Sequence, residues 1–273
     1  MRCLGISRDV LFSPNRSEAD AGIFLSVASE LKDRGKEVIR LTEQELVETG
    51  VPDDIDCVFQ MARSKEALDI LEKVSIPVIN SVRAVRNCNR AVQTRILQYS
   101  GFVPYSIIGS TNDLHFEWMR FPCWIKKGKG HAVDRDDVQF IRDYEELRCV
   151  IKGFAERKIE NFVLQEHVIG RLFKFYGVRG YGLVGCYDVS MKDSKFGLEQ
   201  YNDMSDESQI NRDLLTVLAE HVSQLLDVDI YGGDVILRPD GDMMLIDFND
   251  WPSFQSCREL ATQKIAELIC ARK

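Results

Sequence analysis

The dipeptide Asp240-Gly241, which lies between two apolar runs, constrains the fold more than any other feature of this sequence. Such a dipeptide is a strong signal for a two-residue turn that joins two antiparallel strands. A two-residue loop fixes the register and puts Asp234 opposite Asp247. The same register pairs Val235 with Ile246 and Leu237 with Met244, and it collects one apolar face from Val235, Leu237, Met244, Ile246 and Phe248.

The other face of the predicted hairpin carries Asp234, Asp247 and Asn249, because residues i and i+2 of a strand point the same way. Two facing carboxylates repel, so the pair is destabilising unless a cation neutralises it. Mg²⁺ prefers oxygen ligands and is commonly shared between carboxylates and substrate phosphates. Asn249 adds a neutral oxygen opposite Gly232, where the missing side chain leaves room for phosphate. The hairpin therefore predicts a metal site, and the alternative is a solvated acidic edge.

The composition is that of an ordinary globular protein of 273 residues, 45% hydrophobic and 29% charged. A net charge of -8 argues against a nucleic-acid partner. The sequence has no apolar stretch long enough for a signal peptide or a membrane span, so no membrane partner is expected. Its eight cysteines are scattered without a C-x-x-C pair, which predicts reduced thiols and a cytoplasmic protein.

Strand and helix patterns alternate over the first eighty residues. Strands are predicted at 2–7, 37–41, 55–61 and 77–80, with helices at 19–34, 42–50 and 64–74. This order predicts a small parallel sheet with helices on both faces. The alternation stops near Asn80, and a mixed α+β pattern follows. It comprises helices at 89–100, 143–157, 206–226 and from about 257, and strands at 106–109, 123–127, 138–141, 162–167, 173–179, 182–189 and in the hairpin.

Two further segments have the residue types of a nucleotide site. The strand at 123–127 ends in Lys126 and Lys127 beside a glycine-rich turn that includes Lys129, Gly130 and His131. Lysine offers a point charge to phosphate oxygens, although such strand ends are often simply solvated. The apolar strand at 162–167 breaks abruptly into polar residues, which frees a backbone carbonyl and N–H of the kind that an adenine edge needs. His167 itself is interpreted as a structural histidine.

These three features occur in the order and approximate spacing of the ATP-grasp superfamily, which the chain resembles over most of its length. The segment 245–252, LIDFNDWP, is similar to the closing acid-x-Asn-x-x-Pro signature of that superfamily. The resemblance implies a fold of α/β and α+β class. A pre-grasp domain at 1–80 precedes an ATP-grasp domain at 81–273, whose subdomains at about 81–165 and 166–273 clamp ATP. It also implies ATP and Mg²⁺, or Mn²⁺ in its place, as cofactors.

The resemblance further implies roles for individual residues. Lys126 corresponds to the phosphate-binding lysine, and the hinge corresponds to Gln165, Glu166, His167 and Val168, with adenine contacting Glu166 and Val168. The metal set falls on Asp234, Asp247 and Asn249. An earlier cation matches Arg90, with Arg83, Arg86 and Arg95 as competitors for that role.

The sequence supports two hypotheses for the type of reaction, a ligase and a kinase. Most ATP-grasp enzymes are carboxylate–amine (or thiol) ligases that act through an acyl phosphate. Ribosomal-protein glutamate ligases have an acidic residue two positions before a basic one, where this chain has Leu172 before Lys174, and residues 181–211 contain no Arg. That pattern, with Asp at 247, is similar to the inositol-trisphosphate 5/6-kinases, in which Lys174 would contact phosphate; a solvated lysine is the alternative.

Because most members of the superfamily are ligases, a ligase is the first hypothesis. A kinase that phosphorylates a hydroxyl, which the local residues favour, is the second. A non-catalytic nucleotide-binding protein is the third, and the intact metal set argues against it. The acceptor is expected to be a small molecule or peptide, held by the pre-grasp domain and the loop at 191–206. Lys192 and Lys195 favour an anionic acceptor, although Asp193, Asp203 and Asp206 lie among them. The sequence identifies neither the acceptor nor the oligomeric state.

Overall fold

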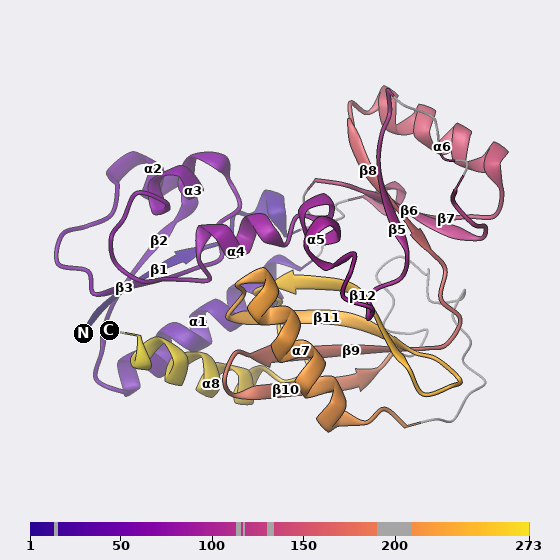
Figure 1. The fold of residues 1–273 in the computed structure, drawn as a ribbon. Helices are drawn as coiled ribbons and strands as arrows, with labels where there is room; N and C mark the ends of the chain where they lie inside the picture. Colours follow the sequence, from indigo (N-terminus) through magenta and orange to yellow (C-terminus); the bar gives the residue numbers. More distant parts are fainter. Residues whose placement is uncertain (14–15, 113–115, 117, 130–133, 190–208, 273) are drawn as a thin grey trace.

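The computed structural model describes residues 1–13, 16–112, 116, 118–129, 134–189 and 209–272, and it places their strands in three four-stranded sheets (Figure 1). Each sheet draws its strands from one continuous stretch of the chain. None of the helices in the part that the structure covers is long and apolar enough to cross a membrane. The division into domains at 80 and at about 165 stays a prediction.

The first sheet is parallel, as predicted, with the strand order β2-β1-β3-β4. Alternate residues of its central strands point to opposite faces: Cys3 and Phe59 pack with α1, whereas Leu4 and Val58 pack with α2 and α3. The predicted capping box of Thr42 and Glu45 opens α2. The elements are β1 (Arg2–Ser7), α1 (Ser17–Asp33), β2 (Glu37–Thr42), α2 (Glu43–Thr49), β3 (Cys57–Gln60), α3 (Lys65–Leu71) and β4 (Val78–Ile79), with a 3-10 turn at Val10–Phe12.

The second sheet is antiparallel, with the order β5-β8-β6-β7. Helix α6 covers it by packing Leu147, Ile151 and Phe154 against Ile125 and Phe162. The Asp143 side chain accepts a hydrogen bond from the Glu146 N–H, so the predicted cap of this helix is confirmed. The elements are β5 (Ser106–Ser110), β6 (Cys123–Lys127), a 3-10 turn (Arg135–Asp137), β7 (Val138–Ile141), α6 (Tyr144–Glu156) and β8 (Asn161–Glu166).

The third sheet is also antiparallel, with the order β10-β9-β11-β12. Helix α7 packs on one face, where Val222 and Leu226 meet Phe175, and α8 packs on the other, where Ile265 shares a core with Ile230 and with Ile23 of α1. The last helix therefore joins the third sheet to the first (Figure 1). The elements are β9 (Arg171–Val178), β10 (Gly182–Asp188), α7 (Arg212–Leu226), β11 (Ile230–Leu237), β12 (Met243–Asp250) and α8 (Arg258–Ala271).

Two helix predictions were wrong in extent. The chain forms two short helices, α4 (Val82–Asn87) and α5 (Arg90–Leu97), where only the second was predicted; Ser81 caps α4 by accepting from the Ala84 N–H. Six residues are too few to show an apolar period, so the cap was the available signal. Helix α7 begins at Arg212 rather than 206, because the Asn211 side chain caps it at Asp213 and Leu214; residues 206–208 lie outside the described residues.

The predicted hairpin register is right at the acidic pair and wrong next to the turn. Asp234 lies opposite Asp247, and Gly232 lies opposite Asn249. Leu237, however, pairs with Met243, so the loop has five residues (238–242) instead of two. It closes through hydrogen bonds from Arg238 N to Asp242 O and from Gly241 N to Arg238 O, both 2.9 Å.

A β-bulge between the turn and the acidic pair reconciles the two registers. Val235 pairs with Leu245, whereas Asp234 pairs with Asp247, so Ile246 is the extra residue on β12. Because of this insertion the predicted apolar face was wrong in composition. The core under α7 takes Val235, Leu237, Leu245 and Phe248, while Ile246 packs with Ile236 and Leu172 in a separate cluster.

A buried polar contact fixes the start of β11 to the first sheet. The Asn80 side chain accepts hydrogen bonds at Oδ1 from the N–H groups of Asp229 and Ile230 and donates through Nδ2 to the Ile230 carbonyl, each at 2.8 Å. Gln60 in turn donates to the Asn80 carbonyl at 2.6 Å. Asn80 is completely buried, and its Oδ1 is the acceptor for the N–H groups of Asp229 and Ile230.

Asn80→Ala is expected to lower the free energy of unfolding by about 3 kcal/mol, because it leaves buried backbone groups of β11 without partners. Urea unfolding followed by circular dichroism measures this change. The exposed Asn112→Ala serves as the control and should change the value by less than about 0.5 kcal/mol. Equal effects of the two substitutions would contradict the role given to Asn80.

Candidate nucleotide and metal site

Lys126 links the second sheet to the third. Its ammonium donates hydrogen bonds to Gln165 Oε1 at 2.7 Å and to the Ile246 carbonyl at 2.9 Å. Ile246 is the bulged residue of β12, and a bulge interrupts the ladder locally, which leaves its carbonyl available to Lys126. Two residues from separate predictions, Lys126 and Gln165, thus meet beside the hairpin that carries the acidic pair.

Lys126 loses its proton more readily than an exposed lysine does. The side chain is almost completely buried, and burial lowers its pKa to about 8, with the nearby Arg90 guanidinium acting in the same direction. Asp247 and Asp234 oppose this shift because their carboxylates favour the ammonium. A buried ammonium that is hydrogen-bonded to two neutral oxygens is well suited to bind phosphate oxygens.

The acidic pair is surrounded by cations. Lys174 Nζ lies 3.0 Å from Asp234 Oδ1, and Arg90 Nη2 lies 3.9 Å from Asp247 Oδ2. Asn249 Nδ2 donates to Asp247 Oδ2 at 3.1 Å, so the predicted metal residues stand side by side. The structure therefore brings Lys126, Arg90 and Lys174 to the same place as Asp234 and Asp247.

These residues fit a Mg²⁺ ion by the chemistry of their donors. Asp234 and Asp247 are opposite one another and are partly open to solvent, and the Asn249 amide uses its nitrogen on Asp247, which leaves its oxygen for a ligand. Among the residues that can be placed, no group of three His, Cys, Asp or Glu side chains could hold a metal. Two carboxylates and one amide oxygen suit Mg²⁺ or Mn²⁺ shared with phosphate, because such a metal takes its remaining ligands from phosphate and water.

The space expected at Gly232 is filled. A Cβ at this position would lie 2.9 Å from the Tyr176 ring and 2.9 Å from Pro252 Cγ. The glycine therefore makes room for these two side chains, and the prediction that it leaves room for phosphate was wrong. The space is filled because Tyr176, on the adjacent strand β9, packs closely against the segment that follows Asn249.

Arg90 is the arginine that reaches the acidic pair. It opens α5, its side chain is largely buried, and Nη1 also donates to the Lys127 carbonyl at 3.4 Å. Among its competitors, Arg86 forms ion pairs with Asp69 and Glu72, and Arg83 and Arg95 are exposed. Helix α5 also bonds the hairpin directly, since Gln93 Nε2 donates to the Phe248 carbonyl at 2.6 Å.

The predicted hinge begins with the last two residues of β8, where the chain passes from the second sheet to the third. Glu166 N–H donates to the Tyr105 carbonyl at 2.9 Å, and His167 N–H donates to the Pro122 carbonyl at 3.4 Å. These two amides are therefore engaged within the protein. His167 Nδ1 accepts from the Trp124 indole at 3.1 Å, and burial lowers the pKa of His167, which agrees with a structural histidine.

Sequence reasoning missed an apolar surface beside Lys126. Val168 of the hinge and Ile246 of the bulge pack on a small cluster formed by Leu172, Val189 and Ile236. This cluster lies on the face of the third sheet that also carries Asp234, opposite the core under α7. The alternation in β9 and β11 could have indicated Leu172 and Ile236, but the bulge concealed Ile246.

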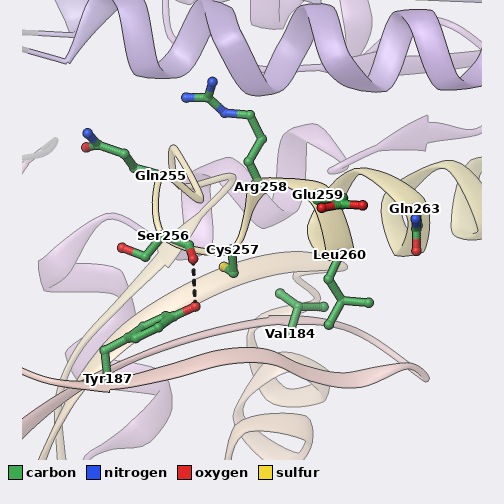
Figure 2. Close-up of a pocket in the computed structure, with 9 residues that line it drawn as sticks. All are labelled: Val184, Tyr187, Gln255, Ser256, Cys257, Arg258, Glu259, Leu260 and Gln263. Atoms are coloured by element: carbon green, nitrogen blue, oxygen red, sulfur yellow. Dashed lines mark hydrogen bonds between the residues drawn. The ribbon is translucent and has the colours of Figure 1, made fainter.

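Sequence reasoning also missed a hollow of about 500 Å³ between β10 and the start of α8 (Figure 2). Tyr187 stands at one wall and donates to the Ser256 carbonyl at 2.9 Å, and Val184 and Leu260 also line the hollow. The Tyr187 ring lies 6.2 Å from that of Tyr176, which itself contacts Gly232. Two tyrosines thus connect the hollow to Gly232, which lies opposite Asn249. The predicted acceptor loop at 191–206, with Lys192 and Lys195, lies outside the described residues.

No protein-family model and no curated protein matches this chain. Solved structures do match over its whole length. D-alanine–D-alanine ligase from Bacillus anthracis complexed with ATP has a TM-score of 0.74 at 16% identity, covering 100% of this chain and 97% of that one. For the RimK domain ATP-grasp protein from Sphaerobacter thermophilus the values are 0.70, 15%, 98% and 100%, and for D-alanyl-alanine synthetase A from Vibrio cholerae 0.71, 12%, 100% and 98%. The chain has the ATP-grasp fold.

The affinity for ATP is expected to fall about tenfold between pH 7 and pH 9. The predicted binding of phosphate by Lys126 requires the ammonium form, and the lowered pKa of about 8 means that Lys126 is mostly charged below this pH and mostly neutral above it. Lys126→Arg keeps its charge throughout this range and should remove the pH dependence. Titration with a fluorescent ATP analogue at constant Mg²⁺ measures both proteins, and equal affinity of the unchanged chain at pH 7 and 9 would contradict the role of Lys126.

Proposed function

We propose that this protein is an ATP-dependent ligase of the ATP-grasp type, which joins a carboxylate to an amine or thiol through an acyl phosphate. The observation that carries the proposal is the meeting of Lys126, Arg90 and Lys174 around Asp234, Asp247 and Asn249. Full-length similarity to a D-alanine–D-alanine ligase complexed with ATP supports it.

The arrangement suggests one orientation for the nucleotide. Adenine would rest on Val168 and Ile246, the partly exposed side chains that pack on the apolar cluster, with the hinge at Gln165 and Glu166 along its edge. The phosphates would then extend toward Lys126, Arg90 and Lys174, whose positive charges lie beside that cluster. Asp234, Asp247 and Asn249 would hold Mg²⁺, which when bound neutralises phosphate charge.

The reaction requires mainly that the phosphates, the carboxylate and the amine (or thiol) be positioned correctly. A carboxylate oxygen of the acceptor attacks the γ-phosphorus, and ADP leaves. An amine (or thiol) then attacks the acyl carbon, loses its proton, and releases inorganic phosphate. Lys126 and Arg90 would attract and orient the negatively charged phosphates, and Lys174 would do so once Asp234 turns toward the metal. Few proton-transfer residues are needed for such a reaction.

The proposed acceptor is a small molecule or a peptide. The neighbouring ligases from Bacillus anthracis and Vibrio cholerae are named for joining alanine units, which supports a carboxylate and an amine of this size. The hollow beside Tyr187 is a space of about 500 Å³ that could receive such a group. Net charge -8 supports the absence of a nucleic-acid partner, and eight free cysteines support a cytoplasmic location.

A kinase remains the second candidate because of one observation on β9. Leu172 is buried in the apolar cluster, so the position that is acidic in glutamate ligases is here part of an apolar surface. Lys174, two residues later, pairs with Asp234 and would contact phosphate when a metal takes that carboxylate. A non-catalytic nucleotide-binding protein would not need the facing carboxylates.

Hydroxylamine distinguishes the two enzymes. A ligase incubated with Mg-ATP and a panel of amino acids, peptides and other carboxylates should yield a hydroxamate, because hydroxylamine captures the acyl phosphate. A colorimetric ferric assay detects it, and ADP release measured in parallel should match it. ADP release with phosphorylation of a polyol and no hydroxamate from any carboxylate would support the kinase instead.

Asp247→Asn is expected to lower Mg-dependent ATP turnover on the order of 100- to 1000-fold, because the metal loses a negatively charged ligand. Its melting temperature should stay close to that of the unchanged chain, since the substitution also removes one of two facing carboxylates. Asp242→Asn, in the exposed loop of the same hairpin, is the matched control and should turn over normally. Full turnover by Asp247→Asn would remove the metal assignment.

A further inference from the structure

Two arginines of the first sheet hold the end of β12, immediately beyond Asn249. Arg63 Nη2 lies 2.9 Å from Asp250 Oδ2 and 3.3 Å from the Asp250 carbonyl. Arg8 Nη2 donates to the carbonyl of the next residue, Trp251, at 2.9 Å. Two consecutive backbone carbonyls after the predicted metal ligand are therefore each bound by an arginine from a distant part of the chain.

The arginines come from loops that are themselves fixed to one another. Arg8 follows β1 and Arg63 follows β3, and these strands are neighbours in a parallel sheet, so both loops leave the same edge. Glu43, which is almost completely buried, accepts hydrogen bonds from the N–H groups of Asp9, Arg63 and Ser64 at 2.9, 3.0 and 2.6 Å. The two loops thus form one rigid support.

Burial restricts the alternatives open to this support. The side chain of Asp250 is 1% exposed and that of Arg63 is 8% exposed. A buried carboxylate cannot leave its cation without a large desolvation penalty, so Asp250 is held in one orientation. On the other side of Asn249, Gln93 holds the Phe248 carbonyl. The peptide units on both sides of Asn249 are therefore anchored.

The geometry points to Arg63 as a positioning residue of the metal site. Through Asp250 it fixes the backbone at Asn249, so that the Asn249 amide and Asp247 present their oxygens to the same divalent cation. This role rests on the proposed function, because it requires the cation. Arg63 acts through Asp250, and Arg8 supports the same turn through Trp251.

The test is Mn²⁺ binding in the presence of a non-hydrolysable ATP analogue, measured by electron paramagnetic resonance. Arg63→Met is expected to raise the Mn²⁺ dissociation constant about tenfold, as is usual for residues that orient metal ligands. The affinity for the analogue without metal, measured by calorimetry, should stay within about twofold. Arg63→Lys, which keeps the positive charge beside Asp250, should recover part of the Mn²⁺ affinity.

Arg179→Met is the matched control, because Arg179 forms ion pairs with Asp227 and Asp229 at the far end of the strand that carries Lys174. It should lower the melting temperature and leave the Mn²⁺ constant unchanged. Equal Mn²⁺ constants in Arg63→Met and the unchanged chain would overturn the positioning role alone. If Arg63→Met does not fold, Asp250→Asn is measured instead, with the same expectations. Nucleotide binding without any metal dependence in the unchanged chain would overturn both this role and the proposed function.

Discussion

The β-bulge at Ile246 is the feature on which the candidate site depends. It restores the register that the five-residue loop shifts by one position, and so it brings Asp247 opposite Asp234. It turns Ile246 away from the core under α7 and into the apolar cluster with Ile236. It also offers the Ile246 carbonyl to Lys126, so that a side chain of the second sheet bonds the middle of β12. A single inserted residue thus sets the acidic pair, an apolar surface and the position of a lysine.

Charge balance explains how so many ionic groups can share this space. Asp234 and Asp247 would repel each other, but Lys174 and Arg90 compensate them, and Lys126 is held by two neutral oxygens. The same cations can transfer to phosphate groups when a metal takes the carboxylates, because both arrangements pair each charge with an opposite one. The low pKa of Lys126 follows from its burial and its proximity to Arg90, and it makes this exchange sensitive to pH.

The first sheet contributes to the site without supplying any of its predicted ligands. Asn80 fixes the start of β11, Arg63 and Arg8 fix the end of β12, and α8 packs against both α1 and the third sheet. The two strands that carry Asp234 and Asp247 are therefore each anchored at one end to the same parallel sheet. Movement of that sheet relative to the hairpin would change the positions of Asp234 and Asp247. The buried polar contacts between the sheet and the hairpin oppose such movement.

The sequence by itself determined the parallel sheet, most strands and helices, and the hairpin that carries Asp234 and Asp247, whereas the bulge decides that these two residues lie opposite one another. Local signals carried these predictions: alternation of apolar residues, side-chain caps such as those of Thr42 and Asp143, and a glycine turn between apolar runs. The same signals place Lys126 at the end of a strand. They also select Asn249 two residues after Asp247, since the period of a strand is two.

Only the tertiary structure decided what surrounds these residues. The five-residue loop, closed by the hydrogen bonds of Arg238, sets a register one residue away from that of the acidic pair, and the bulge accommodates this difference. Leu245 and Phe248 then both pack under α7. No local sequence pattern reveals the bulge. The choice of Arg90 over its competitors and the filling of Gly232 by Tyr176 follow from how helices and strands distant in sequence pack together. The ion pair of Arg63 and Asp250 joins residues 187 positions apart. Such contacts are set by the packing of whole elements, whereas periodicity and capping are set by neighbouring residues.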